Sequence, residues 1–188
     1  DGWAVIRADV STSASVTSVR NTIIGHYNSD PTNVKAVYIV GHVAVPYSGN
    51  VAPDGHGSHQ GAWPCDGYYG ELNGSWTDNS VSVQASQNPK NFNVPGDGKF
   101  DQSDFPSALE LQVGRVDLSD MPAFNTTEVE LMRNYLNKAH TFKVKGYTPS
   151  PRAMMFDNLQ WVGNPLAASG WRSIPAMVGS DQISAPYQ

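Results

Sequence analysis

The chain has little cysteine, little charge and no long apolar run. Cys65 is its only cysteine, so no disulfide can form within the 188 residues. Charged residues make up 15% of the sequence, against about 25% in an average soluble domain. A net charge of −5 excludes the strongly basic surface that nucleic-acid binding needs. No apolar run approaches the roughly 20 residues of a transmembrane helix, so we expect no membrane span.

Uncharged polar residues and aromatic residues are plentiful. Hydrophobic residues make up 39% and aromatic residues 10% of the chain, which supports a folded core and excludes disorder throughout. Ser, Thr, Asn and Gln supply most of the polarity, a composition common in proteins outside the cell. The chain opens without Met or a signal peptide and closes in a loop-like stretch. We therefore expect a piece of a longer, secreted protein.

Strand and helix patterns alternate in the first forty residues or so. The apolar run 3–8 predicts a strand, and apolar residues at three- and four-residue steps predict a helix over about 16–26. The nearly continuous apolar run 35–41 predicts a strand that is buried on both faces, as in a parallel sheet. Together these elements would form a βαβ unit with a right-handed crossover. The sequence therefore predicts an α/β fold with a mostly parallel sheet flanked by helices.

A long irregular segment follows between about residues 42 and 108. It is rich in Gly, Pro, Asn and Asp, and only residues 81–83 indicate a short strand. Loops of this length usually contain residues that take part in catalysis or in ligand binding. Regular structure resumes with a predicted strand over 109–116. Thr127 and Glu130 then form a capping box that opens a helix.

The apolar side of this second helix is expected to face the core. Its inward residues would be Val129, Met132, Leu136 and Ala139. Two prolines end the region, and residues 152–157 predict a further strand. We therefore divide the chain into an α/β subdomain over 1–150, with the insertion at 42–108, and the truncated start of a second α/β subdomain over 151–188.

The segment from Asn93 to Asp104 has the spacing of a twelve-residue calcium loop. Such loops place oxygen ligands at alternate positions around the cation, with a glycine, here Gly98, at the sharp turn. The sequence departs from the pattern at Pro95, where an oxygen ligand is usual, and in ending on Asp instead of Glu. The loop resembles those of dockerin-type modules without their flanking helices, and a solvated polar turn is the alternative. The predicted calcium ligands are Asn93, Asp97, Lys99, Asp101 and Asp104. Lys99 would bind through its backbone carbonyl.

A second group of chemically versatile side chains lies in the Gly-rich segment before Cys65. Two imidazoles and two carboxylates within thirteen residues can bind a transition metal, and a Cys–His pair can act as a nucleophile. Neither spacing matches a rigid helical site, so a hydrogen-bonded loop is the simpler interpretation. His42 follows a predicted strand, which is where ligands bind in open α/β sheets. The residues of this possible ligand-facing loop are His42, Asp54, His56, His59, Asp66, Tyr68 and Tyr69.

The order of several short motifs resembles the gingipain-type cysteine peptidases, which have a caspase-like fold. The motifs, spread over about residues 34–157, are Val40-Gly41-His42-Val43, Asp66-Gly67-Tyr68-Tyr69 and Val113-Gly114-Arg115. The resemblance implies a three-layer α/β sandwich, a secreted bacterial protein and a precedent for structural calcium. It also implies that the catalytic His-Gly and Cys lie downstream. His56-Gly57 and Cys65 precede the Val-Gly-Arg strand and do not match those catalytic positions, and His42 stands where the family has Asp.

The resemblance implies that this chain is the N-terminal, non-catalytic subdomain of a gingipain-like cysteine endopeptidase. Its expected partner is then the downstream catalytic subdomain. A non-catalytic extracellular module that binds glycan or protein, or that assembles, is the alternative, because aromatic side chains offer binding faces. The tryptophans that motivate this alternative are Trp63, Trp76, Trp161 and Trp171. A third hypothesis is an unrecognised catalytic or metal site at Cys65, His56 and His59.

Overall fold

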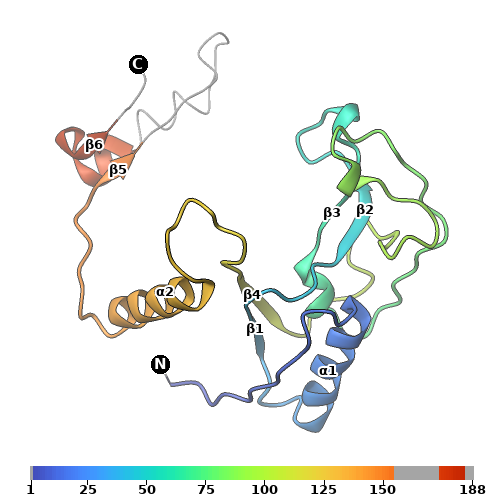
Figure 1. Cartoon of the computed structure of the whole chain (residues 1–188), viewed down its shortest axis with the longest axis horizontal. Helices are drawn as coiled ribbons and strands as arrows, with labels where there is room; N and C mark the ends of the chain where they lie inside the picture. The colour runs from blue at the N-terminus through green and yellow to red at the C-terminus, as the bar shows by residue number, and fades with distance from the viewer. Residues whose placement is uncertain (1, 155–173, 185–188) are drawn as a thin grey trace. The chain divides into compact units, whose positions relative to one another are not determined.

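The computed structural model of the chain describes residues 2–154 and 174–184, which have a mixed α/β structure (Figure 1). These residues fall into two compact units, and the boundary between the units lies within helix α2 (Glu128–Lys143). The larger unit, residues 2–136, contains the predicted calcium ligands and the residues of the possible ligand-facing loop. The described part of the chain has no helix long and apolar enough to cross a membrane.

Helix α1 (Val16–Ser29) begins where its apolar periodicity predicts and extends to Ser29. Ser15 is its N-cap, and the Ser15 hydroxyl accepts a hydrogen bond from the Ser18 N–H at 3.1 Å. After the helix, the Asp30 N–H still bonds the Tyr27 carbonyl at 3.1 Å, and Pro31 prevents any continuation. The cap and the stop signal are local, which explains why both could be predicted.

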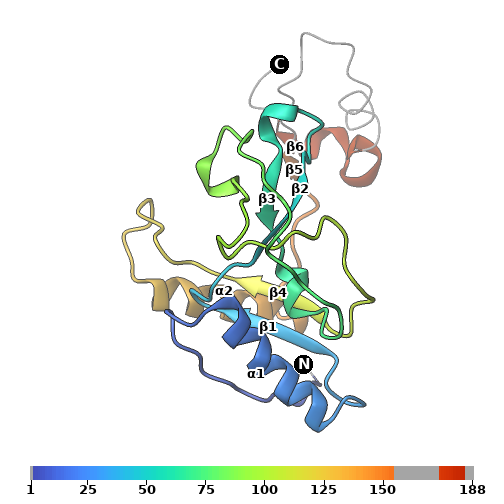
Figure 2. The ribbon, with the colours of Figure 1, turned by 90° about the vertical axis from the view of Figure 1, so that its right-hand side faces the viewer.

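Strands β1 (Ala36–Val40) and β4 (Gln112–Val116) form a two-stranded parallel sheet. Ala36 lies opposite Gln112 and Val40 opposite Val116. Both strands were predicted from apolar runs, and the small parallel sheet confirms the α/β class. Helix α1 runs beside β1 (Figure 2).

The core of the larger unit lies between α1, β1 and the 3₁₀ turn η2 (Asp66–Tyr69). Val19 of α1 and Ile39 of β1 are both 5% exposed, and Tyr68 and Tyr69 are almost completely buried. Tyr68 stacks on Phe100 with ring centroids 4.5 Å apart. The aromatic residues of the long segment thus complete a core that the two strands alone are too small to build.

The expectation that β1 is buried on both faces is wrong. Val37 and Ile39 point to the core, whereas Tyr38 and Val40 on the opposite face are 52% and 45% exposed. Side chains alternate between the faces of a strand, so one face remains open when elements cover only the other. The prediction failed because the apolar composition of β1 is typical of a strand that is buried on both faces.

The expected N-terminal strand over residues 3–8 is also wrong. Residues 2–10 belong to no strand, and Trp3 is 65% exposed. A strand requires a hydrogen-bonded neighbour, and β1 pairs with β4. The predicted βαβ unit is therefore not formed, although its helix and its second strand are.

The long segment over 42–108 is mostly irregular, as predicted, but contains an antiparallel hairpin that was not. Strand β2 (Tyr47–Val51) pairs with β3 (Gly61–Pro64), with an irregularity between Ser48 and Val51. The 3₁₀ turns η1 (Gly57–His59) and η3 (Pro89–Asn91) lie in the same segment. Residue Val83 forms an isolated antiparallel bridge with Asn93, where a short strand was predicted.

Helix α2 opens with the predicted capping box. The Glu130 N–H donates to the Thr127 hydroxyl at 3.2 Å, and the Thr127 N–H donates to the Glu130 carboxylate at 3.2 Å. None of its residues is buried. Of the four residues expected to face the core, Val129 is 64% and Leu136 41% exposed, whereas Met132 and Ala139 are half-buried. The amphipathic pattern predicted the helix itself, but it did not predict how far these side chains are exposed.

The smaller unit contains a second parallel pair, β5 (Ala153–Met154) and β6 (Ile183–Ser184). The predicted strand over 152–157 is therefore present at Ala153 and Met154, and its last three positions lie outside the described residues. Two of the three small sheets among the described residues are parallel and one is antiparallel.

Candidate functional site

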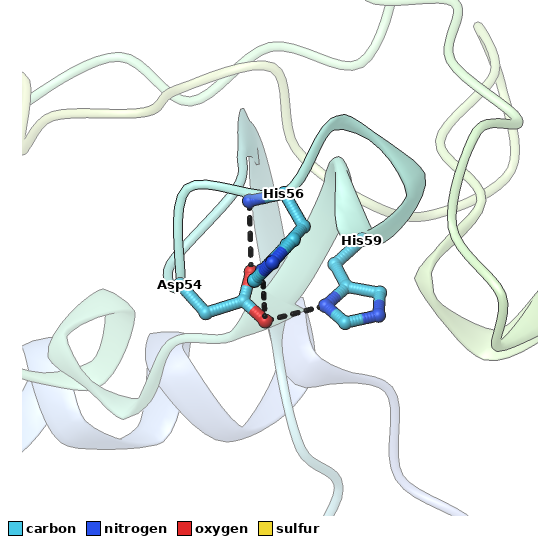
Figure 3. A group of neighbouring side chains, drawn as sticks. All are labelled: Asp54, His56 and His59. Carbon is cyan, nitrogen blue, oxygen red and sulfur yellow. Dashed lines mark hydrogen bonds and ion pairs between the residues drawn. The ribbon is translucent and has the colours of Figure 1, made fainter. Parts of the chain in front are cut away.

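Asp54, His56 and His59 lie together in the connection between β2 and β3 (Figure 3). We call these three residues the hairpin-tip cluster. The 3₁₀ turn η1 ends at His59, and His56 is its N-cap. The two imidazole rings lie near each other, with centroids 5.5 Å apart. The histidines do not share a helix, but their side chains meet at the same aspartate.

Both imidazoles of the hairpin-tip cluster point to one carboxylate oxygen. The Nδ1 atoms of His59 and His56 lie 2.5 and 3.2 Å from Asp54 Oδ2. Asp54 Oδ1 accepts the His56 backbone N–H at 3.1 Å, which closes an Asx turn. That N–H and the His59 imidazole lower the pKa of Asp54 to about 2. The carboxylate is therefore ionised throughout the physiological range.

The loop that carries the cluster is fixed to its surroundings by hydrogen bonds. The Trp63 indole N–H donates to the His59 carbonyl at 3.3 Å, and the Gln87 N–H donates to the Ser58 carbonyl at 2.8 Å. The Gly55 N–H closes a turn on Ala52 O at 2.9 Å. The backbone is therefore held on both sides of the three side chains.

Cys65 does not belong to the hairpin-tip cluster. Among the described residues, the group of His, Cys, Asp and Glu side chains close enough to share a metal ion contains Asp54, His56 and His59 alone. Burial raises the pKa of the Cys65 thiol, which disfavours the nucleophilic thiolate. Cys65 therefore lacks the lowered pKa of an activated nucleophile.

In the predicted calcium loop, Asn93 is completely buried and ties the loop to its neighbours. Its Nδ2 donates to the carbonyls of Gly49 and Phe100 at 3.0 and 2.8 Å. Its Oδ1, by contrast, is a buried oxygen without a hydrogen-bond partner in the described structure. Asp104, at the other end of the loop, is exposed.

The charge that faces Asp97 is the ammonium of Lys99. Lys99 Nζ lies 3.0 Å from Asp97 Oδ2 and also donates to the Phe92 carbonyl. Burial raises the pKa of Asp97, but hydrogen bonds from Lys99 and Val94 outweigh it and lower the pKa overall. The carboxylate of Asp78, which sequence reasoning missed, accepts the N–H groups of Gly96 and Gly98 at 2.8 and 2.7 Å.

Asp101 anchors the segment 77–81 instead of pointing to a free space. Its two oxygens accept the Thr77 hydroxyl at 2.7 Å and the backbone N–H groups of Asn79, Ser80 and Val81 at 2.8 to 3.1 Å. These donors outweigh the effect of burial and lower the pKa of Asp101. In this conformation its acceptor positions are occupied by protein donors.

His42 lies at the carboxyl end of the β1–β4 pair, as expected. Its Nδ1 is 3.0 Å from Asp117 Oδ2 and 2.9 Å from the Ser119 hydroxyl. A catalytic Ser-His-Asp triad needs the serine and the aspartate on opposite ring nitrogens. Here both contact Nδ1, so the three residues do not form a triad.

Asp66, Tyr68 and Tyr69 hold the core together, whereas the sequence placed them in a ligand-facing loop. Asp66 binds Arg115 of β4 through two bonds, of 2.7 and 2.9 Å. The buried Tyr69 donates its hydroxyl to Ala44 O at 2.7 Å, and burial raises the pKa of Tyr69 to about 12. The Asp-x-Tyr-Tyr and Val-Gly-Arg motifs thus contact each other directly.

Glu71 is a completely buried carboxylate that sequence reasoning missed. Its Oε1 accepts the Gly74 and Asn73 N–H groups at 2.5 and 3.1 Å, and its Oε2 accepts the Trp76 indole N–H at 2.6 Å. Arg20 of α1 lies 3.4 Å from Oε2. A glutamate in an irregular segment carries no periodic pattern, so nothing in the sequence indicated that it is buried.

Two of the four tryptophans on which the binding-module alternative depends, Trp63 and Trp76, lie among the described residues. Trp63 and Trp76 are both half-buried, and each donates its indole N–H within the protein. Trp76 also packs edge-on against Tyr68 and Phe100. Neither is a freely exposed aromatic platform. Trp161 and Trp171 lie outside the described residues.

Comparison of the chain with protein-family models, with curated proteins and with solved structures finds no match.

Proposed function

We propose that residues 2–136 form the non-catalytic N-terminal subdomain of a larger secreted bacterial protein, a gingipain-like cysteine endopeptidase. In this proposal the subdomain is a scaffold on which a downstream catalytic subdomain packs. The observation that carries the proposal is the uncovered apolar side of the β1–β4 pair.

This uncovered side extends from the strand to the helix. Tyr38 and Val40 of β1 are half-exposed, and Val129 and Leu136 of α2 are exposed. The Tyr38 hydroxyl lies 3.4 Å from the Tyr135 hydroxyl, so the strand and the first part of the helix meet here. Exposed apolar side chains on adjoining elements are typical of an interaction surface.

A second α/β half is the occupant that fits this surface best. Parallel sheets are normally covered on both faces and have about four to six strands, whereas β1 and β4 form a pair. Further strands beside this pair, with helices over Tyr38 and Val40, would complete a three-layer sandwich of the caspase-like kind. The motif order over 34–157 supports the same occupant.

The chemistry of the described residues supports a non-catalytic role. The Cys65 thiol is half-buried with a raised pKa. His42 has its serine and aspartate on one ring nitrogen. The two family-like motifs are joined by the Asp66–Arg115 pair, which is a structural contact. In this proposal the catalytic Cys and His-Gly lie in the downstream half, as the resemblance to the gingipain-type peptidases implies.

Calcium binding by the loop 93–104 stays a proposal. The buried, unpartnered Oδ1 of Asn93 is an oxygen that a cation would satisfy. The Lys99 ammonium bonds Asp97 in this structure, so a calcium ion bound by Asp97 would have to displace that ammonium. To bind the ion, Asp101 would have to give up hydrogen bonds that it accepts from the segment 77–81.

The proposed function predicts that the secreted protein has thiol-dependent peptidase activity that does not depend on Cys65. Protein from the culture medium is assayed with and without iodoacetamide, in the natural form and as Cys65→Ala. We expect iodoacetamide to abolish the activity of both forms, and kcat/KM of Cys65→Ala to stay within about twofold, since another thiol performs the reaction.

Melting temperature serves as the control, because Cys65 is half-buried and its replacement can affect stability. Absence of any iodoacetamide-sensitive peptidase activity would contradict the proposed function. Loss of activity in a Cys65→Ala protein that melts like the natural one would contradict the non-catalytic role of this subdomain.

A further inference from the structure

We propose that Asp54, His56 and His59 form a binding site for a divalent transition-metal ion, and that Zn²⁺ is the ion that fits it best. This site is independent of the proposed scaffold function and of the calcium loop.

The ligand atoms of the hairpin-tip cluster already converge. One ligand atom from each of the three residues lies within 4.8 Å of the other two. Figure 3 shows both imidazole rings directed at the same carboxylate of Asp54. The Nδ1 atoms of His59 and His56 contact one oxygen, Asp54 Oδ2, at 2.5 and 3.2 Å.

The local backbone brings these side chains together before any ion is bound. The Asx turn at Asp54 and the 3₁₀ turn over Gly57–His59 set the directions of the carboxylate and of the two rings. Gly55 adopts a φ of 79°, which an L side chain rarely adopts, and this lets the chain reverse between Asp54 and His56. The ordering of the loop is thus supplied by the fold and does not have to be supplied by the metal.

Only small side-chain movements separate this arrangement from a metal site. Zn–N and Zn–O bonds of about 2.0–2.2 Å place tetrahedral ligands roughly 3.3 Å apart. The Asp54–His59 contact would therefore lengthen from 2.5 Å while the remaining ligand distances adjust. The Asp54 and His56 side chains are exposed and the His59 side chain is one-third exposed, so these rotations meet little resistance.

The donor set selects the type of ion. Two imidazole nitrogens and one carboxylate suit Zn²⁺ and its neighbours Co²⁺, Ni²⁺ and Cu²⁺, whereas Ca²⁺ requires oxygen ligands throughout. Three protein ligands leave one tetrahedral position open, which water would take in this exposed loop.

The test titrates the full chain with Zn²⁺ by calorimetry and with Co²⁺ by visible absorption, which reports the coordination geometry. We expect one equivalent of either ion to bind and Ca²⁺ in excess not to compete. His56→Ala, His59→Ala and Asp54→Asn should each weaken binding by about 100-fold or more, since loss of even an outer-shell partner costs about 10–100-fold.

His42→Ala is the matched control, because His42 also contacts an aspartate, at 3.0 Å, but has no second imidazole beside it. Its affinity for Zn²⁺ should match that of the unmodified chain. Absence of stoichiometric binding by the unmodified chain would overturn the proposal. Equal weakening by His42→Ala, or full binding retained in both Asp54→Asn and His59→Ala, would overturn it as well. Circular dichroism confirms that each variant is folded.

Discussion

Glu71→Ala is expected to lower the free energy of unfolding by about 3–5 kcal/mol, the usual cost of removing one partner of a buried ion pair. Glu71 is completely buried and accepts hydrogen bonds from Gly74, Asn73, Trp76 and Ser107. Alanine would remove the acceptor of these donors, whereas the Arg20 guanidinium would keep its hydrogen bonds to the backbone carbonyls of Tyr68 and Glu71.

Urea denaturation at pH 7 measures this effect, and two variants control it. Glu71→Gln keeps one acceptor oxygen but loses the charge, so its cost should lie between zero and that of alanine. Glu128→Ala removes an exposed glutamate from the first turn of α2 and should cost less than about 1 kcal/mol. A cost below about 1 kcal/mol for Glu71→Ala would show that the network does not stabilise the fold.

The contribution of Glu71 should also depend on pH. Burial raises the pKa of Glu71, but hydrogen bonds from Ser107, Trp76 and Gly74, with the charge of Arg20, outweigh it and hold the pKa below its usual value. A carboxylate whose folded-state pKa is depressed stabilises the protein above its unfolded pKa, about 4.3 for Glu. That stabilisation is lost as the pH falls through the folded-state pKa, so the difference between Glu71→Gln and the unmodified chain should shrink in acid.

Arg115→Ala is expected to lower the free energy of unfolding by about 2–4 kcal/mol. This is somewhat less than the loss expected for a fully buried ion pair, because the Arg115 and Asp66 side chains are partly exposed. Arg115 binds both oxygens of Asp66 and donates to the carbonyls of Val43 and Ala44 at 2.6 and 3.1 Å. One guanidinium thus joins β4 to η2 and to the segment that follows β1. Lysine cannot reproduce a planar, bidentate contact, so Arg115→Lys should also destabilise the fold.

A double-mutant cycle with Asp66→Asn isolates the pair, with an expected coupling energy of about 1–3 kcal/mol. Arg7→Ala is the control, because the Arg7–Asp9 pair is exposed and should contribute less than about 1 kcal/mol. Additive effects of Arg115→Ala and Asp66→Asn would contradict the view that the two motifs stabilise each other.

The parts of the fold that could be predicted are those that local patterns determine. Ser15 caps α1, and Thr127 with Glu130 caps α2, through contacts within three residues. The apolar runs of β1 and β4 identified both strands. The hairpin β2–β3 could not be found in this way, because Ser48, Gly49 and Asn50 have no apolar alternation.

The candidate site illustrates the same division between local and distant contacts. Composition selected Asp54, His56 and His59, but only the folded loop shows that both rings face one carboxylate. The spacing predicts that Asp101 and Asp97 are metal ligands. In the structure, Asp101 accepts backbone amide N–H groups and Asp97 pairs with the Lys99 ammonium. Those partners come partly from the segment 77–81, about twenty residues away, which no loop pattern can anticipate.

The intact mass of the protein isolated from its natural source tests the proposal that residues 2–136 pack against a second α/β half. The account predicts a mass well above the 20.3 kDa of these residues, with the additional sequence containing the catalytic Cys and His-Gly. A mass that matches these 188 residues apart from glycans would contradict it.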